Sequence, residues 1–148
     1  MKKYILLTLA LLACFLSGYA FDKYSIDRND LPVAAQQFLT DYFPKSKVGM
    51  VKTDKHLLKK TDYDVKLVNG TKIEFNNAGK WTSVDCKNRE VPEGIIPKNI
   101  RNYVKKNFPD VKIVKIEKTL TKYEVGLSDD VELTFNSLGQ FKSMKLDD

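Results

Sequence analysis

Apolar residues recur along the chain with two periods, one typical of helices and one typical of strands. In segment 31–42 the period is 3.6 residues, which places one side of a helix against a core: Leu31, Ala34, Ala35, Phe38, Leu39 and Tyr42. Asp30 is a candidate N-cap, Pro32 suits the first turn, and Pro44 ends the helix. The same pattern predicts a second helix between Ile96 and Pro109.

The remaining apolar runs alternate with polar residues at a period of two, which predicts strands with one buried and one wet face. The clearest case is 63–67, in which Tyr63, Val65 and Leu67 alternate with Asp64 and Lys66. The predicted strands are 48–51, 63–67, 71–75 and 80–84, followed by 113–116, 123–127, 131–135 and 140–144. Each half of the chain is therefore expected to hold a helix followed by four antiparallel strands.

The turns between these strands fix the register. Three-residue loops at 68–70, 77–79 and 137–139, each ending in a left-handed glycine, bring apolar residues onto one face. The pairs predicted are Val65–Ile73, Tyr63–Phe75, Phe75–Trp81 and Phe135–Phe141. The only tryptophan, Trp81, is therefore expected in the core rather than in a binding site.

The opposite face of the predicted sheet is polar and carries both signs of charge. Its register sets Lys66 opposite Lys72 and Asp64 opposite Glu74, and Val84 and Met144 are also placed on this face. The candidate partner-binding residues are Lys66, Lys72, Glu74, Lys80, Thr82, Glu132, Thr134 and Lys142. Such a face has two interpretations, a solvated surface or a recognition surface that runs across both halves.

The two halves repeat one another. Leu31-Pro32 recurs 65 residues later as Ile96-Pro97, and after a five-residue deletion the offset is 60, so that Gly79 matches Gly139. Longer matches are Tyr63-Asp64-Val65 with Tyr123-Glu124-Val125, and Ile73-Glu74-Phe75-Asn76 with Leu133-Thr134-Phe135-Asn136. The predicted organisation is a signal peptide at 1–20, an N-terminal segment at 21–29, repeats at 30–86 and 91–148, and a linker at 87–90.

The first twenty residues read as an export signal. Lys2 and Lys3 precede an apolar run from 4 to 16, which is too short to span a membrane, and small residues at Gly18 and Ala20 suit cleavage after Ala20. The chain is therefore expected in the periplasm or outside the cell, without a transmembrane span. The alternative is a lipoprotein with a lipid anchor at Cys14, since 11–14 loosely resembles a lipobox.

Composition narrows the function classes. The 148 residues are 43% hydrophobic and 30% charged, which is typical of a globular protein. The net charge of +6 falls to +4 without the two lysines of the signal, and this excess favours solubility over nucleic-acid binding. After cleavage Cys86 is the remaining cysteine, expected as a small buried residue, with a reactive thiol or an intermolecular link as alternatives.

Catalytic and metal-binding signatures are missing from the sequence. His56 is the sole histidine, it is expected in the basic loop 55–61, and neither nucleotide-binding, hydrolase, zinc nor calcium-loop motifs occur. We therefore expect no catalytic residues, no metal and no cofactor. A carboxylate-based enzyme is kept as the least favoured hypothesis.

The export leader and the two copies of Leu/Ile-Pro, Phe-Pro, Tyr-acid-Val, apolar-x-Phe-Asn and Gly-x-aromatic resemble the β-lactamase-inhibitor-like, PepSY-like family of exported bacterial proteins. The resemblance implies an α+β fold in which two tandem helix-plus-four-strand repeats form one continuous antiparallel sheet with helices on one face. It also implies a link to inhibition of secreted hydrolases, although a fold alone does not transfer function.

These observations predict an exported, non-enzymatic module that binds another envelope or secreted protein or a peptide through its open sheet face. An inhibitor or a chaperone of an envelope hydrolase is the specific form expected. The alternative is a binding protein for a small ligand or an envelope component, which uses a cleft between the repeats.

Overall fold

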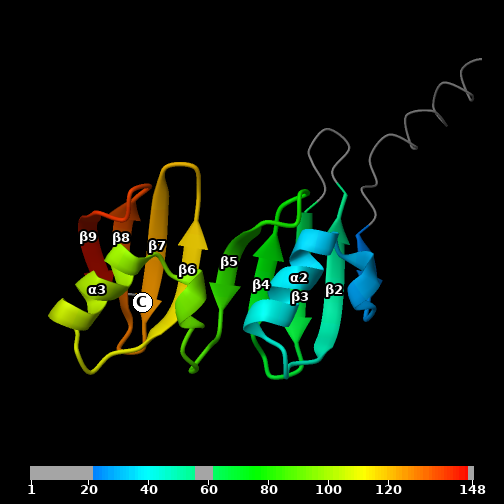
Figure 1. The fold of residues 1–148 in the computed structure, drawn as a ribbon, viewed down its shortest axis with the longest axis horizontal. Helices are drawn as coiled ribbons and strands as arrows, with labels where there is room; N and C mark the ends of the chain where they lie inside the picture. The colour runs from blue at the N-terminus through cyan, green and yellow to red at the C-terminus, as the bar shows by residue number, and fades with distance from the viewer. Residues whose placement is uncertain (1–21, 56–61, 147–148) are drawn as a thin grey trace, which may run out of the picture.

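The computed structural model describes residues 22–55 and 62–146, and the strands in these ranges form one antiparallel sheet. Each strand pairs with the next along the chain, so the sheet order is β1 to β9 (Figure 1). The strands are β1 (Lys23–Ser25), β2 (Val48–Asp54), β3 (Asp62–Leu67), β4 (Lys72–Phe75), β5 (Trp81–Asp85), β6 (Ile113–Lys118), β7 (Lys122–Leu127), β8 (Val131–Asn136) and β9 (Phe141–Leu146).

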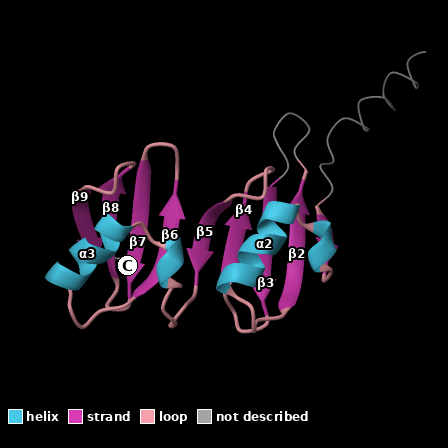
Figure 2. Ribbon diagram, viewed as in Figure 1, coloured by secondary structure: helices cyan, strands magenta, loops and turns pink. Residues whose placement is uncertain are grey.

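Helices lie on one face of this sheet, as Figure 2 shows. They are the short 3₁₀ helices η1 (Arg28–Asp30) and η2 (Glu93–Ile95) and the α-helices α2 (Val33–Tyr42) and α3 (Lys98–Asn107). The predicted α+β class with an open antiparallel sheet is confirmed. The order 3₁₀ helix, α-helix and four strands occurs twice, once in the first half (residues 22–86) and once in the second half (residues 87–146). Neither β1 nor the 3₁₀ helices were expected from the sequence.

Several sequence predictions fall outside the described ranges. These are the signal peptide with its cleavage after Ala20, the lipid anchor at Cys14, and His56 with most of the basic loop 55–61. Within the residues that the structure describes, no helix combines the length and the apolar character needed to cross a membrane.

The prolines limit both α-helices. Pro32 and Pro97 occupy the N-cap positions of α2 and α3. The predicted N-cap role of Asp30 is wrong, because Asp30 lies in η1 and forms an ion pair with Lys23 at 3.4 Å. At the other end Phe43 leaves helical geometry, because the proline that follows it disfavours a helical conformation there. The N–H of Phe43 still donates to the carbonyl of Leu39.

The predicted register of the hairpins is confirmed. Tyr63 lies opposite Phe75 and Val65 opposite Ile73, and the aromatic pairs Phe75–Trp81 and Phe135–Phe141 form as well. Gly70 has the left-handed φ of 92° that the three-residue loop requires. The apolar sets of successive strands therefore share one face, which lies beneath the helices.

Two β-bulges change the face of residues beyond the aromatic pairs. The register shifts between Glu74 and Phe75 and again between Thr134 and Phe135, so that Ile73 pairs with Val84 and Leu133 with Met144. The placement of Val84 and Met144 on the open face was therefore wrong. The extra residue of each bulge disrupts the strict alternation on which that placement depended.

The core is built around one apolar row that crosses the sheet. The fully or almost fully buried side chains in this row are Val51, Val65, Ile73, Val84, Ile116, Val125 and Leu133. The helices cover a neighbouring aromatic row, where Phe38 of α2 meets Phe75 edge-on at 5.4 Å and Tyr103 of α3 meets Phe135 in the same way. Burial of each large aliphatic side chain contributes about 1.5–3 kcal/mol to stability.

The two halves join where β5 pairs with β6. Val84 lies opposite Ile116, and neither side chain is exposed. Trp81 packs against the core but is only partly buried, and the ammonium group of Lys118 in β6 lies 4.1 Å from its ring centre. The Tyr42 hydroxyl in α2 also donates to the carbonyl of Gly94 at 3.4 Å. The sheet is therefore continuous through apolar contacts across the junction.

Equivalent turns bring β4–β5 and β8–β9 close to the helix starts. The side-chain oxygen of Asn76 accepts hydrogen bonds from the N–H groups of Ala78 and Lys80, and Asn136 does the same in the second half. Gly79 combines a φ of 76° with close approach to α2, since a Cβ atom there would lie 2.8 Å from Cβ of Pro32. A glycine at this position therefore allows the turn to contact the helix.

Replacing Gly79 by alanine is expected to destabilise the protein more than replacing Gly70. Gly70 also has a left-handed φ, but a Cβ atom there would meet nothing within 4 Å. We expect Gly70→Ala to lower the free energy of unfolding by about 1 kcal/mol, because of backbone strain alone. Gly79→Ala should lower it by about 3 kcal/mol, because overpacking against α2 is added to the strain. Urea unfolding measures both, and equal losses would contradict the proposed contact with α2.

Candidate functional site

The open face of the sheet carries charged residues in two rows that run across the strands. The acid-rich row contains Lys52, Asp64, Glu74, Ser83, Glu117, Glu124 and Thr134. The lysine-rich row contains Met50, Lys66, Lys72, Asp85, Lys115, Gly126, Glu132 and Lys145. The helices of the described chain lie on the opposite face, so both rows face solvent (Figure 2).

Many charges on this face are paired locally. Ion pairs join Lys115 to Glu117 at 2.9 Å and Lys145 to Glu132 at 3.0 Å. Lys122 pairs with Glu124 at 2.6 Å in the second half. Exposed pairs of this kind contribute roughly 0–1 kcal/mol each, so they mainly neutralise the surface.

A cluster of four charged residues on β3 and β4 departs from this pattern of local ion pairs. We refer to these residues, Asp64, Lys66, Lys72 and Glu74, as the β3–β4 quartet. Asp64 lies directly opposite Glu74, and Lys66 directly opposite Lys72. Among the described residues no ion pair within 4 Å involves the quartet. Like charges in directly opposite positions destabilise a sheet.

The second half lacks this arrangement. The positions equivalent to the quartet pair Glu124 with Thr134 and Gly126 with Glu132. Neither pair brings like charges together, and both acids have lysine partners. Glu117 and Glu124 do lie opposite one another in the second half, but each is paired with a lysine, so the unpaired like charges are a feature of the first-half quartet.

The pKa values of the quartet acids reflect their surroundings. Partial burial raises the pKa of Asp64, and the nearby carboxylates of Asp54 and Asp62 raise it further, while Lys52 opposes them. Partial burial also raises the pKa of Glu74, with added repulsion from Asp64 and Glu117. Ionisation of both carboxylates therefore carries a local penalty, which a cationic group from a partner would relieve.

Two hollows open on the same region of the sheet. One, of about 240 Å³, is lined by Met50, Lys52, Asp64, Val65, Lys66, Lys72, Ile73 and Glu74. The other, of about 320 Å³, is lined by Asp54, Asp62, Asp64, Glu74, Phe75, Asn76 and Thr82. Asp64 and Glu74 contribute to both hollows, so the face over β2–β4 is concave and charged.

The structure divides the sequence-predicted site residues into two groups. Lys66, Lys72 and Glu74 lie together, and the hydroxyl of Thr82 donates to the carbonyl of Glu74 at 3.4 Å. Lys80 lies in the β4–β5 turn, where its carbonyl accepts from the N–H of Asn76. Glu132, Thr134 and Lys142 lie on β8 and β9. Because four strand spacings separate β4 from β8, the second group is about 19 Å away.

The residues that β2 contributes to the concave region were not expected from the sequence. Met50, Lys52 and Asp54 come from β2, which was predicted to end at Val51 but continues to Asp54. The alternation of Val51 and Thr53 inward with Lys52 and Asp54 outward was the available signal. Hydrogen bonds from Lys52 to Asp54 and Asp22 raise the pKa of this lysine, so its positive charge is firmly held.

Cys86 lies in the core and is 2% exposed. Burial raises the pKa of its thiol, which disfavours the thiolate that a nucleophile requires. The expectation of a small buried residue is confirmed.

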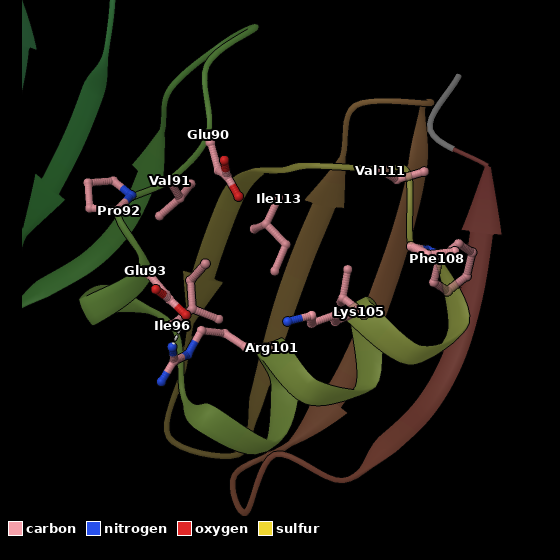
Figure 3. A pocket seen from close by; sticks show the side chains of 12 residues that line it. Glu90, Val91, Pro92, Glu93, Ile96, Arg101, Lys105, Phe108, Val111 and Ile113 are labelled. Carbon is pink, nitrogen blue, oxygen red and sulfur yellow. Dashed lines mark hydrogen bonds and ion pairs between the residues drawn. The ribbon is translucent and has the colours of Figure 1, made fainter.

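A cavity of about 590 Å³ lies on the helix side of the second half (Figure 3). Its wall combines apolar side chains with the charged groups of Glu90, Glu93, Arg101 and Lys105, and Arg101 is paired to Glu93. In the first half Arg28, which is 65 residues before Glu93, donates to the carbonyl of Gln36 and the hydroxyl of Thr40 across the corresponding space. The residues that line the cavity place it between η2, α3 and β6.

Metal-ligating residues do not converge in residues 22–55 and 62–146: no three of His, Cys, Asp or Glu are arranged there to hold one ion. The acids of the open face come from neighbouring strands in a row across the sheet, which suits a surface better than a coordination sphere.

Comparison with known proteins identifies the family of this chain. A family described as "Putative beta-lactamase-inhibitor-like, PepSY-like" matches residues 61–143. The chain belongs to this PepSY-like family. The family resemblance expected from the sequence motifs is thereby confirmed, while no curated protein matches the chain.

Solved structures of similar proteins come from Bacteroides. A putative periplasmic protein of unknown function from Bacteroides vulgatus is 40% identical, with a TM-score of 0.81, and the match covers 84% of this chain and 99% of that one. A putative calcium-regulated periplasmic protein from Bacteroides thetaiotaomicron is also 40% identical, with a TM-score of 0.79 and coverage of 84% and 96%. A second periplasmic protein from Bacteroides vulgatus is 39% identical, with a TM-score of 0.80 and coverage of 86% and 99%.

The double variant Asp64→Asn, Glu74→Gln is expected to unfold at higher urea concentration than the wild type at pH 7. The variant removes the repulsion between two carboxylates that face each other across β3 and β4, which should raise the free energy of unfolding by on the order of 0.5 kcal/mol. Because the folded-state pKa values are raised above 3.8 and 4.5, the wild type gains stability by protonation as the pH falls through the raised values. The advantage of the variant should therefore shrink towards pH 4.

Glu132→Gln is the matched control on the same face. Glu132 is paired with Lys145, so its removal should leave stability unchanged or slightly lower at pH 7. A double variant that is less stable than the wild type at pH 7 would contradict the proposed repulsion.

Proposed function

We propose that this PepSY-like protein is an exported, non-enzymatic module that binds another envelope or secreted protein, or a peptide, through the open face of its sheet. The β3–β4 quartet is the observation that carries the proposal. Two pairs of like charges face each other on an uncovered, concave surface and lack ion-pair partners among the described residues. A partner that offers a cation to the acids and an anion to the lysines would relieve both repulsions.

The dimensions of the sheet suit this role. Nine strands at the usual spacing extend about 40 Å, and a standard interface needs about 800 Å² from each partner. The quartet lies near the middle of the first half, so a partner can contact it and still extend across β5 and β6. Occlusion of the partner's own site by this surface is the mechanism by which such a module would inhibit a hydrolase.

Tandem repeats and export complete the proposal. The repeated element order and the equivalent Asn76 and Asn136 turns support two repeats at 30–86 and 91–148 with a linker at 87–90. The periplasmic descriptions of the similar structures support export to the periplasm or beyond. Lipid attachment at Cys14 remains the alternative to a cleaved signal.

Charge reversal tests the open face directly. The mature protein, the variant Lys66→Glu, Lys72→Glu and the control Lys98→Glu, Lys106→Glu on α3 are each used for affinity capture from envelope extract of the source cells. We expect a protein that the wild type and the control recover and that the open-face variant loses at least tenfold, because reversed charges repel it. Equal recovery by all three proteins would contradict the proposal.

Calcium binding is a second candidate function. The similar Bacteroides thetaiotaomicron protein is described as calcium-regulated, and the hollow beside the quartet is lined by the carboxylates of Asp54, Asp62, Asp64 and Glu74. Calcium takes six to eight oxygen ligands at 2.3–2.6 Å, so these side chains would have to rotate towards one ion.

Thermal unfolding with increasing calcium tests this candidate. A site on the folded protein should raise Tm in proportion to the logarithm of calcium concentration, and Asp64→Asn should abolish the shift. Magnesium serves as the matched control ion. A Tm that is independent of calcium would contradict calcium binding. Equal Tm shifts with calcium and magnesium, seen also for Asp64→Asn, would contradict it as well.

Small-ligand binding also stays a prediction, and the cavity of Figure 3 is the place that the structure offers for it. Its wall holds both apolar side chains and charged groups, and convergent polar groups in a concave site can orient a ligand. This cavity lies within the second half rather than in a cleft between the repeats, so the Lys66→Glu, Lys72→Glu variant should leave any such binding unchanged.

A further inference from the structure

The last strand of the sheet, β9, has a free edge and exposed apolar side chains. Among the described strands it pairs with β8 alone, and all six of its residues are exposed. Phe141, Met144 and Leu146 are 38%, 59% and 73% exposed. Met144 and Leu146 lie opposite Leu133 and Val131, so they continue the apolar face of the sheet past its last covered strand.

The helix above β9 covers only its beginning. Tyr103 of α3 stacks on Phe141 with ring centres 4.7 Å apart. Met144 and Leu146 remain largely exposed. Exposed apolar residues on an unpaired edge are a liability unless another strand covers them.

The first half contains the same edge in a covered state. β5 begins after the same Asn-x-x-Gly turn as β9, carries its bulge at the same point, and has Val84 where β9 has Met144. The outer edge of β5 is paired with β6, and Val84 is 0% exposed. The equivalent position is therefore buried in the half where a further strand covers the edge.

The β5–β6 junction also shows what an added strand should contain. Ile116 lies opposite Val84 and Glu117 opposite Ser83, and the third pair, Asp85–Lys115, joins opposite charges. On β9 the corresponding residues are Met144, Ser143 and Lys145. The matching strand would place an apolar residue opposite Met144 and acids opposite Ser143 and Lys145.

Charge distinguishes this partner from a second molecule of the same protein. β9 carries Lys142 and Lys145, so two β9 strands side by side would bring four lysines to one seam. Lysine on an edge is a common device against such self-pairing. An acidic strand would meet Lys142 favourably and would lie opposite Lys145, which is already paired with Glu132 at 3.0 Å.

We propose that β9 is a docking edge for an extended segment of a partner protein with the alternating pattern acid, branched apolar residue, acid, which adds antiparallel to the sheet as a tenth strand. Backbone hydrogen bonds would supply affinity, and Met144 with the two lysines would supply selectivity. This edge is separate from the β3–β4 quartet, so the proposal does not depend on the open face.

The probe is the labelled peptide Thr-Val-Glu-Ile-Glu-Val-Thr, and its control is Thr-Val-Lys-Ile-Lys-Val-Thr. Fluorescence anisotropy measures affinity, and hydrogen exchange measures protection of the amides of 141–146. We expect the acidic peptide to bind about tenfold more tightly than the basic one and to protect β9. The variant Lys142→Glu, Lys145→Glu should reverse the preference.

Two further measurements keep the result specific. Met144→Glu, an exposed substitution that should leave Tm nearly unchanged, is expected to weaken the acidic peptide at least tenfold. The open-face variant Lys66→Glu, Lys72→Glu should bind the peptide as the wild type does. Equal binding of the two peptides, no protection of β9, or a concentration-dependent dimer with β9 protected without peptide would each overturn the proposal.

Discussion

One requirement shapes the part of the protein that the structure describes: a sheet of nine strands must bury a single apolar face with two α-helices of ten residues each. The row from Val51 to Leu133 meets it because each strand from β2 to β8 contributes a buried aliphatic residue at the same level. Phe38 and Tyr103 then anchor the helices on Phe75 and Phe135. The helices cannot cover more, and the sheet consequently has one covered face, one open face and a free edge.

The open face and the edge carry features that stability does not explain. Opposite like charges on β3 and β4 reduce stability, and exposed apolar residues on β9 invite association. The second half avoids the first feature at equivalent positions, and the first half avoids the second because β6 covers β5. At equivalent positions each half thus lacks the unfavourable feature that the other half carries. We therefore attribute both features to binding.

The sequence predicted most of the fold because its turns are explicit. Gly70, Gly79 and Gly139 end three-residue loops, and that spacing fixed which residues face each other, including the quartet. The bulges at Thr82 and Lys142 were not predictable, since no residue type there marks an extra position, and this put Val84 and Met144 on the wrong face. The hollows and the cavity depend on side-chain packing between distant segments, which a local pattern does not contain.

The central claim is that the junction of β5 and β6 joins both halves into one sheet with one core. Trp81 is the only tryptophan and lies in the first half, so its fluorescence follows that half, while far-UV circular dichroism follows the whole chain. The two signals, recorded in the same urea titration, should give one coincident transition. Separate midpoints, with Trp81 exposed while the second half stays folded, would contradict the claim.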